Sequence, residues 1–319
     1  MLTFSVVVAA VLAAGGRTGD LAGTPGSAAG KAAPGVVSAP AAVTAREQQA
    51  VAGYWTQARM AAATRTAPAG SASRAVPAWL SGNTAGRGLR WTHGGAVARI
   101  TGKVFFTLGG TDYVCSGSAV DSPRSDVVLT AAHCVGNGPG QWAANWTFVP
   151  GYRDGAAPYG RYTARRFFVS PRWRPAGAEQ YDVAFVQVNP ATLDGPRPHA
   201  VALPRGAPLA FAARAGVYPA GAAYVFGYPA EAPFSGRYSD YCAGPMTPDR
   251  RGSVRTPCAM TAGDSGGPWF AGFRPRQGAG TIVAVSTFKL TSDMALLYGT
   301  VLGPAARVLY QQASISPGG

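Results

Sequence analysis

The pattern of apolar and polar residues from about residue 97 onward predicts a series of short β-strands. Runs rich in β-branched and aromatic residues recur there, and turn-forming Gly, Pro, Asn and Asp separate them. The expected strands are 103–108, 113–120, 127–130, 146–149, 162–170, 183–188, 224–226, 282–288 and 297–301. A last helix is expected from Pro304 to about Gln312. Many short strands followed by one terminal helix indicate β-barrels.

The beginning of the chain has a different pattern. Residues 4–14 form an apolar run of the length found in signal peptides, although no Lys or Arg precedes it. We favour a secretory signal at residues 1–20 over the alternative, a buried strand.

Residues 21–96 are rich in Ala, Gly, Ser, Thr and Pro, and most of this stretch is too poor in large apolar side chains to fold alone. One part differs, because residues 42–65 place Tyr54, Trp55 and Met60 among good helix formers and predict a short amphipathic helix. A plain linker with a marginal helix is one interpretation. The other is a pro-segment at 21–96 whose helix docks on the mature domain, and we adopt it.

Composition narrows the class of protein. The chain has 319 residues, of which 47% are hydrophobic and only 13% charged, with 43 Gly and 26 Pro. Such a chain can bury a large core, but its composition is not that of a coiled coil or a long helical bundle. Its apolar runs are shorter than the roughly 18 residues that a membrane-spanning helix needs, so we expect no transmembrane segment.

The net charge is +14, from 28 Lys and Arg against 14 Asp and Glu. A basic surface can bind nucleic acid, an anionic cell envelope or an acidic substrate. The positive residues are scattered, however, and form neither a basic helix face nor a stripe with interleaved aromatic residues. We therefore expect no specific nucleic-acid partner, and at most non-specific contact with anionic surfaces.

The four cysteines all lie in the β-rich region, at positions 115, 134, 242 and 258. Four cysteines allow three pairings, and the spacing matches no zinc motif. Disulfides formed in an oxidising compartment are the simplest interpretation, and they agree with an exported protein.

His133 and Asp182 each combine a chemically active side chain with a suggestive position. His133, one of three histidines, directly follows the strand expected at 127–130, and Asp182 begins the apolar run 182–188. A single His is more often structural, and an Asp at a strand entry is more often a turn residue. A partly buried Asp needs a charge-assisted partner, however, and His133 can supply it.

The third candidate is Ser265, in the sequence Gly263-Asp264-Ser265-Gly266-Gly267-Pro268. The glycines permit backbone conformations in which successive N–H groups converge on one point beside the serine hydroxyl. An ordinary Gly-Pro turn would explain this segment equally well if it stood alone.

Together these segments resemble the trypsin/chymotrypsin-like serine peptidases, in particular their secreted bacterial, actinobacterial-type branch. The sequence Ala131-Ala132-His133-Cys134, the acid Asp182 and the Ser265 motif occur in that family's order, separated by 49 and 83 residues. The segment Tyr54–Met60 also resembles a motif in the pro-segments of secreted actinobacterial peptidases of this type. The resemblance implies an all-β fold of two antiparallel six-stranded barrels packed face to face, at about 97–195 and 200–316, within a peptidase domain at 97–316.

The resemblance also implies a role for each matching residue. Ser265 would be the nucleophile, His133 the base that later acts as acid, and Asp182 the group that orients the imidazole. The N–H groups of Gly263 and Ser265 would form the oxyanion hole. Ser286 would bond the catalytic Asp and begin the strand pairing with the substrate backbone.

Disulfides Cys115–Cys134 and Cys242–Cys258 follow from the same resemblance. Ala259 stands where trypsins carry an Asp at the floor of the specificity pocket, and Val285 stands where glutamyl-specific relatives carry a His. We therefore expect an uncharged side chain at P1, the substrate residue before the cleaved bond. The implied substrate-binding residues are Ala259, Met260, Ser286, Thr287 and Phe288.

The predicted function is that of a secreted, extracellular serine endopeptidase, made as a precursor. It would cleave polypeptides as a monomer without a metal or other cofactor. A protein of the same fold that has lost activity and serves in binding or adhesion is the main alternative. An α/β-hydrolase esterase is disfavoured, because that fold orders its triad Ser, acid, His.

Overall fold

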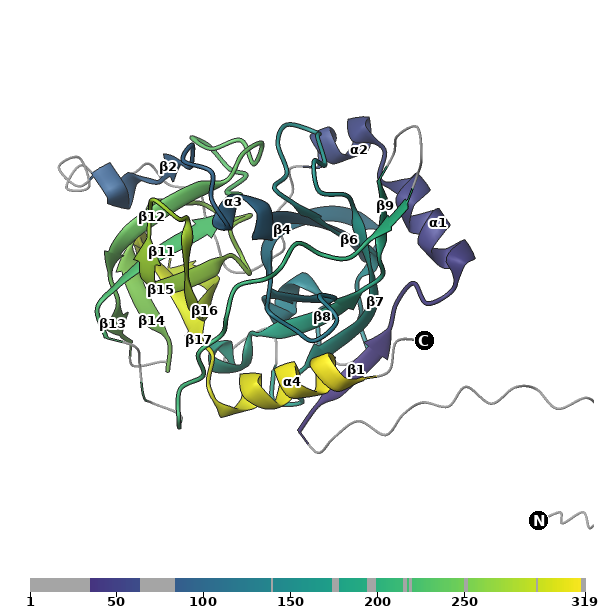
Figure 1. Cartoon of the computed structure of the whole chain (residues 1–319). Coiled ribbons are helices and arrows are strands. Elements are labelled where there is room, and N and C mark those ends of the chain that lie inside the picture. Colours follow the sequence, from purple (N-terminus) through teal and green to yellow (C-terminus); the bar gives the residue numbers. More distant parts are fainter. Residues whose placement is uncertain are drawn as a thin grey trace, which may run out of the picture. The chain divides into compact units, whose positions relative to one another are not determined.

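A computed structural model describes residues 35–63, 84–138, 140–173, 178–193, 199–214, 217, 220–249, 252–290 and 292–316. The signal peptide predicted at residues 1–20 lies outside these ranges. The strands form two large antiparallel sheets, seen side by side in Figure 1 in blue-teal and green-yellow.

The first sheet closes on itself as a six-stranded barrel. Its strands follow the order β3–β4–β5–β8–β7–β6, and β6 pairs again with β3. Their bounds are Thr101–Leu108 (β3), Thr111–Ala119 (β4), Val127–Thr130 (β5), Ala144–Pro150 (β6), Tyr162–Val169 (β7) and Ala184–Val188 (β8). All six had been expected from the sequence within a few residues. Strands such as β3, in which seven of eight residues are buried, are covered on both faces.

The second sheet contains eight strands in the order β13–β14–β17–β16–β15–β11–β12–β2. Their bounds are Leu89–Arg90 (β2), Ala222–Gly227 (β11), Asp240–Pro245 (β12), Thr247–Pro248 (β13), Val254–Pro257 (β14), Pro268–Arg274 (β15), Ala279–Leu290 (β16) and Asp293–Val301 (β17). The sheet curls until β12 approaches β14, where a Cβ on Gly244 would come within 2.9 Å of the Thr256 hydroxyl. The predicted disulfide Cys242–Cys258 joins these two edges, so it closes the curled sheet covalently. The predicted all-β fold is thereby confirmed: the first sheet is a closed six-stranded barrel, and the second has eight strands where the sequence predicted six.

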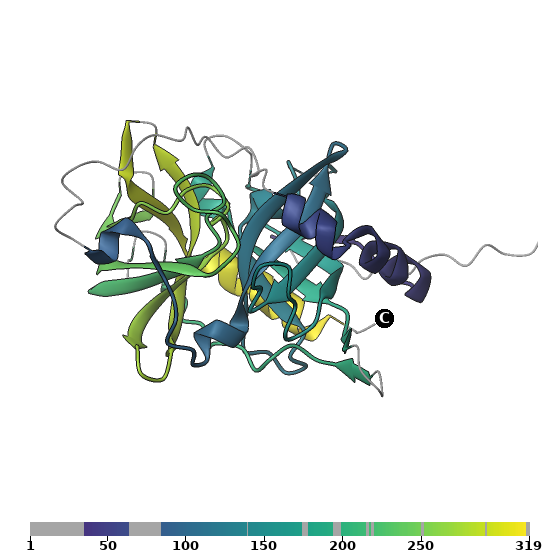
Figure 2. The same cartoon turned by 90° about the horizontal axis from the view of Figure 1, so that it is seen from above.

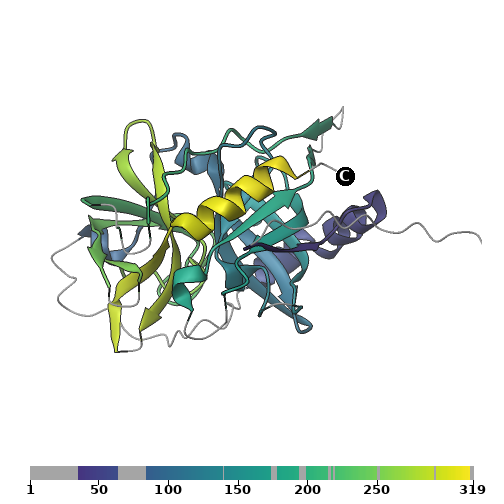
Figure 3. The same cartoon turned by 90° about the horizontal axis from the view of Figure 1, so that it is seen from below.

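Short elements link and cover the sheets. The turn η2 (Thr84–Arg87) and the helix α3 (Val97–Ile100) precede β3. Strand β9 (Ala191–Leu193) pairs with β10 (His199–Val201) in the part of the sequence that follows the last strand of the first barrel. The C-terminal helix α4 (Pro304–Ile315), yellow in Figure 3, returns from the second sheet and lies across β7 and β8. The Gln187 amide on β8 donates to the carbonyls of Ala313 and Ser316, so the helix end is tied to the first barrel. In the described ranges no helix is long and apolar enough to cross a membrane.

Residues 35–63 fold against the first barrel instead of remaining an irregular lead-in. Strand β1 (Val37–Pro40) adds to β7, and two helices follow, α1 (Ala45–Tyr54) and α2 (Gln57–Ala62), purple in Figure 2. The sequence predicted one helix at 42–65, and the structure has two. They are separate because Thr44 and Thr56 each cap a helix by accepting from a backbone N–H, so a second helix starts at Gln57.

Trp55, between the two helices, anchors this segment. Its side chain is fully buried and packs against Phe105 with ring centroids 5.3 Å apart. The neighbouring Arg59 forms an ion pair with Asp112 on β4 at 2.8 Å, but Arg59 is largely exposed. The buried aromatic contact therefore contributes more to docking than the surface charge pair does.

We expect the Trp55→Ala variant to lose about 3–5 kcal/mol of unfolding free energy, because it leaves a large cavity in a closed aromatic cluster. Urea unfolding followed by circular dichroism in a Ser265→Ala background, which removes the predicted nucleophile, measures this loss. Val43→Ala is the matched control on the same segment, since Val43 is 43% exposed and should cost less than about 0.5 kcal/mol. Equal losses in the two variants would show that Trp55 does not anchor the segment.

Candidate active site

His133 lies in a single turn, η3 (Ala132–Cys134), directly after β5. Its Nδ1 lies 2.7 Å from Asp182 Oδ2, and its backbone N–H donates to Asp182 Oδ1 at 2.9 Å. One carboxylate therefore holds both the ring and the main chain of the same residue. The ring can rotate little, and its Nε2 has no hydrogen-bond partner among the described residues.

Asp182 reaches this position from the turn η4 (Glu179–Tyr181), which ends where β8 begins. Its backbone N–H donates to Glu179, and its side chain is only 6% exposed. Because β5 and β8 are neighbours in the barrel, the ends of the two strands bring His133 and Asp182 together although 49 residues separate them. The pairing that the sequence suggested for these two residues is present.

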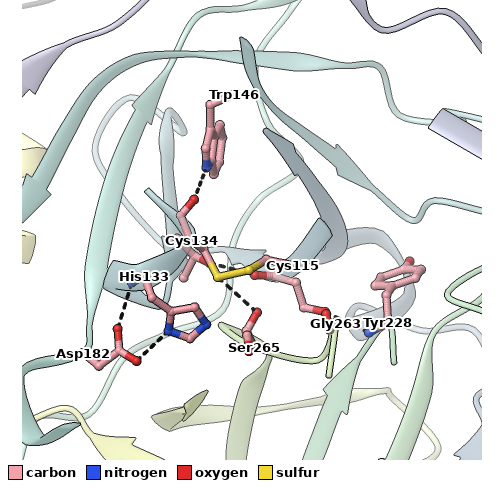
Figure 4. The surroundings of a disulfide bond; sticks show 10 residues. Cys115, His133, Cys134, Trp146, Asp182, Tyr228, Gly263 and Ser265 are labelled. Carbon is pink, nitrogen blue, oxygen red and sulfur yellow. Dashed lines mark hydrogen bonds and ion pairs between the residues drawn. A yellow bond between two sulfur atoms is a disulfide. The ribbon is translucent and has the colours of Figure 1, made fainter. Parts of the chain in front are cut away.

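The disulfide Cys115–Cys134 fixes the backbone next to His133 (Figure 4). The Cys134 carbonyl also accepts a hydrogen bond from the indole of Trp146 at 3.0 Å. The Ser265 carbonyl faces this bridge, 3.7 Å from Cys134 Sγ, and the backbone N–H of Ser116 donates to it at 2.8 Å. The loop of the second sheet that carries Ser265 thus lies against the residues that hold His133.

The glycines of this loop are required by close contacts. Gly263 has φ +103°, and a Cβ there would meet the Tyr228 carbonyl at 2.7 Å. A Cβ on Gly266 would meet the Thr130 hydroxyl at 2.2 Å. The loop can therefore lie against both neighbouring segments only because these two residues lack side chains.

The N–H groups of Gly263 and Ser265 are oriented through the carbonyls of their own peptide units. The Ala262 carbonyl accepts from the Ala230 N–H, and the Asp264 carbonyl accepts from the Gly267 N–H, both at 2.8 Å. In a trans peptide the N–H points opposite to the carbonyl. Each of the two N–H groups therefore points away from the hydrogen bond that the carbonyl of its own peptide unit accepts.

Two charged side chains are buried beneath the loop. Burial raises the pKa of Asp264 to about 7, although Lys289 and His133 oppose that rise. Burial also lowers the pKa of Lys289 to about 8. The Lys289 ammonium donates to the carbonyls of Cys258, Met294 and Leu296, which ties β16 to the segment before Ser265.

Lys103 is a second buried cation, on β3 of the first barrel. Its side chain is 3% exposed, and Nζ donates to the Gly236 carbonyl at 2.9 Å. It lies 5.1 Å from the ring centroids of both Phe105 and Tyr152. Burial lowers its pKa to about 8, so folding opposes its protonation.

The structure places the predicted substrate-binding residues less favourably than the sequence implied. Met260 and Ser286 are fully buried, because residues 86–88 cover Met260 and Trp269 packs beneath Ser286. Ala259 is 5% exposed and donates its N–H to the Gly86 carbonyl, whereas Phe288 is half-buried and stacks on Tyr298. Only Phe288 of this set has appreciable exposed surface.

The contacts of Ser286 differ from those of its predicted role. Its hydroxyl accepts from the Trp269 indole at 3.0 Å, and the described residues show no bond from it to Asp182. Its backbone is also occupied, because Ser286 donates to the Gly267 carbonyl and accepts from the Gly266 N–H. A strand of substrate cannot pair with backbone groups that already bond the loop that carries Ser265.

Thr287, the next residue, connects β16 to the turn beneath Asp182. Its hydroxyl lies 2.8 Å from that of Thr300 on β17, and the Thr300 hydroxyl donates to the Glu179 carbonyl. Thr287 is 3% exposed, so it supports the site from within. No sequence motif marked this threonine pair, because it forms only when β17 lies beside η4.

One group of side chains in the described ranges has the composition of a metal site, namely Cys115, His133 and Cys134. Both sulfur atoms belong to the disulfide. Sulfur binds metals as the thiolate, so this group does not fit a metal ion.

Comparison with known proteins agrees with this geometry. The family model described as "Trypsin-like peptidase domain" matches residues 115–273, which include all three candidate residues. The crystal structure of the protease Anisep from Arthrobacter nicotinovorans is 36% identical, with a TM-score of 0.60 over 68% of this chain and 96% of that one.

The chain belongs to the trypsin-like serine peptidase family.

A second solved structure supports this assignment to the trypsin-like peptidases. The thermostable serine protease AL20 from an extremophilic microorganism is 30% identical, with a TM-score of 0.60 over 69% of this chain and 99% of that one. A curated relative named "Extracellular metalloprotease", from Bacillus subtilis, is 31% identical over 77 residues. That match spans only 24% of this chain and 24% of the relative.

The buried Lys103 gives this trypsin-like peptidase a specific pH dependence of stability. Its pKa is lower in the folded protein, about 8, than the usual 10.5, so the unfolded chain binds more protons between these values. The unfolding free energy should therefore rise from pH 8 to 10.5, by at most about 3 kcal/mol from this group. Lys103→Met should lack that part of the rise.

Urea unfolding at several pH values, in the Ser265→Ala background, compares the two proteins. The contribution of Lys289, whose pKa is also about 8, is common to both and cancels in the difference. If the two curves of unfolding free energy against pH are parallel, Lys103 is protonated in the folded state and its assigned burial is wrong.

Proposed function

We propose that this trypsin-like peptidase is a secreted serine endopeptidase in which His133, Asp182 and Ser265 form the catalytic triad. The observation that carries the proposal is the pair of hydrogen bonds that Asp182 accepts from the ring and the backbone of His133, next to the loop of Ser265. An Asp used only as a turn residue would not need to bind both the ring and the backbone of a histidine.

The chemistry follows from the roles of these three groups. Ser265 Oγ attacks the carbonyl carbon of the peptide bond while His133 Nε2 takes its proton, and the C–N bond breaks as His133 passes that proton to the leaving amine. Water then hydrolyses the acyl-enzyme by the same route. Asp182, bonded to Nδ1, keeps the free Nε2 of the neutral ring as an acceptor and stabilises the imidazolium.

The N–H groups of Gly263 and Ser265 are the donors we assign to the oxyanion hole. Their own peptide carbonyls bond inward, to Gly267 and Ala230, which supports an outward direction for both donors. Fixed dipoles of this kind stabilise the developing negative charge without reorganising during the reaction.

We also propose extracellular secretion as a precursor, monomeric action on polypeptides, and only non-specific contact of the basic surface with anionic material. Two disulfides and the relatives with protease activity support an extracellular location. The shift in composition between Ala75 and Ile100 predicts a maturation cut within that range. Residues 84–100 contribute β2, the buried Trp91 and α3 to the fold, so we place the cut at 75–83.

For the P1 side chain we propose an uncharged residue. Ala259 offers no negative charge, and the Lys289 ammonium on the neighbouring Cys258 carbonyl would repel a basic side chain. That ammonium donates to three carbonyls already, so it has no free donor for an acidic side chain either.

Covalent labelling with a fluorophosphonate tests the triad. We expect one label on Ser265, found by peptide mapping, and none on Ser265→Ala. Asp182→Asn should slow labelling about 10³- to 10⁴-fold, because the ring then loses the acceptor that sets its tautomer. The intact mass of the labelled species shows whether residues 40–75 have been removed.

A folded protein that takes no label would contradict the peptidase assignment and favour the alternative, a binding protein on the same fold. If the active species is still uncut within residues 75–83, the proposed cut is wrong, and the peptidase assignment is unaffected.

A peptide library varied only at P1 tests the specificity. Uncharged P1 residues should be cleaved at least about 100-fold faster than Lys or Arg, because an unpaired cation beside Lys289 is strongly destabilised. The control is Lys289→Met, which should reduce the discrimination against basic residues. Preferred cleavage after Lys or Arg in the wild-type protein would disprove the proposal.

A further inference from the structure

The side chain of Ser116 is completely buried between the two sheets, and its hydroxyl, backbone N–H and carbonyl all form hydrogen bonds. It lies on β4, directly after Cys115. Its hydroxyl donates to the Gly263 carbonyl at 2.8 Å and accepts from the Tyr228 N–H at 2.8 Å. Its backbone N–H donates to the Ser265 carbonyl, also at 2.8 Å.

These bonds restrain the two peptide units on either side of the Ser265 N–H. The Gly263 carbonyl belongs to the peptide unit that precedes Asp264, and the Ser265 carbonyl belongs to the unit that follows Ser265. When both outer units are fixed, the peptide between Asp264 and Ser265 has little freedom to rotate. Its N–H is one of the two donors assigned to the oxyanion hole.

Ser116 is itself held in place from three directions. Strand pairing with Lys103 sets its register in the barrel, the Thr130 hydroxyl donates to its carbonyl at 2.8 Å, and the disulfide fixes its neighbour Cys115. A Cβ on Gly227 would come within 3.2 Å of the Ser116 hydroxyl, so the second sheet leaves room for this side chain and little else. Because Ser116 is held rigidly in the first barrel, its hydrogen bonds fix the position of the loop that carries Ser265 relative to that barrel.

We infer that Ser116 is a positioning residue for the oxyanion hole, and that its hydroxyl keeps the Ser265 N–H aimed at the reacting oxygen. The inference rests on the proposed function, since it assigns a role within the same site. Ser116 does not touch the substrate, and it acts through the Gly263 carbonyl.

Ser116→Ala removes the hydroxyl and leaves the Gly263 carbonyl and the Tyr228 N–H without their partner. We expect kcat for p-nitrophenyl acetate and the rate of fluorophosphonate labelling to fall about 10- to 100-fold, with KM changed less than about 3-fold. The final labelling stoichiometry should stay near one, because the nucleophile remains intact. A merely structural role would lower the amount of folded enzyme and leave the rate per labelled site unchanged.

Ser118→Ala is the matched control. Ser118 lies two residues further along the same strand and is equally buried, and in the described part of the chain its hydroxyl bonds only the adjacent Ala119 carbonyl. It should label at the wild-type rate. Ser116→Cys keeps a weaker donor at nearly the same volume and should give an intermediate rate, which tests the inference even if the Ala variant does not fold.

The outcomes separate the two claims. If wild-type protein labels and a folded Ser116→Ala or Ser116→Cys variant labels at the same rate, the positioning role is overturned and the peptidase assignment stands. If folded wild-type protein takes no label at all, the proposed function itself fails. Slower labelling in Ser118→Ala of the same size would show that the effect is general to β4.

Discussion

The contact between β4 of the first barrel and the loop 262–267 of the second sheet is the constraint on which the site depends. The first barrel supplies His133 and Asp182, whereas the loop supplies Ser265, so their relative position is a property of the interface. Backbone and side-chain bonds of Ser116 and the close approach of Gly266 to Thr130 fix that interface within narrow limits. Because the bonds are buried, misplacing one partner leaves unsatisfied polar groups, which resists sliding of one sheet past the other.

Several buried polar and charged groups near this interface oppose folding and need compensation. Asp264 and Lys289 lie under the nucleophile loop, and burial shifts both pKa values toward neutrality. The Lys289 ammonium is compensated by three carbonyls, while one oxygen of Asp264 has no partner among the described residues. Because these buried groups do not stabilise the loop, its shape is set by the contacts around it. The stabilising free energy comes from the aromatic cores of the two sheets.

The first barrel is completed by segments from both ends of the described chain. Residues 35–63 add β1 to β7 and bury Trp55 against Phe105, and α4 covers β7 and β8 from the opposite end of the sequence. A closed barrel of six short strands has an apolar outer surface as well as an interior. Residues 35–63 and α4 cover part of this surface, which explains why a region of low sequence complexity contains a buried tryptophan and methionine.

The sequence alone determined the strands of the first barrel and the terminal helix, because these depend on local periodicity. It also determined the motifs around His133 and Ser265, because few other structures require those residue types in that order. Strands β12, β14 and β15 escaped prediction, since Cys, Gly and Pro interrupt their pattern and their stability comes from partners distant in the chain. The environment of Ser286 and the burial of Met260 were misjudged for the same reason: the bulged pairing of β16 and the covering turn at 86–88 exist only in the folded molecule. Ser116 carries no motif at all. Tertiary structure alone decides its role, because the hydrogen bonds of a buried serine depend on which backbone groups the two sheets bring within 3 Å of it.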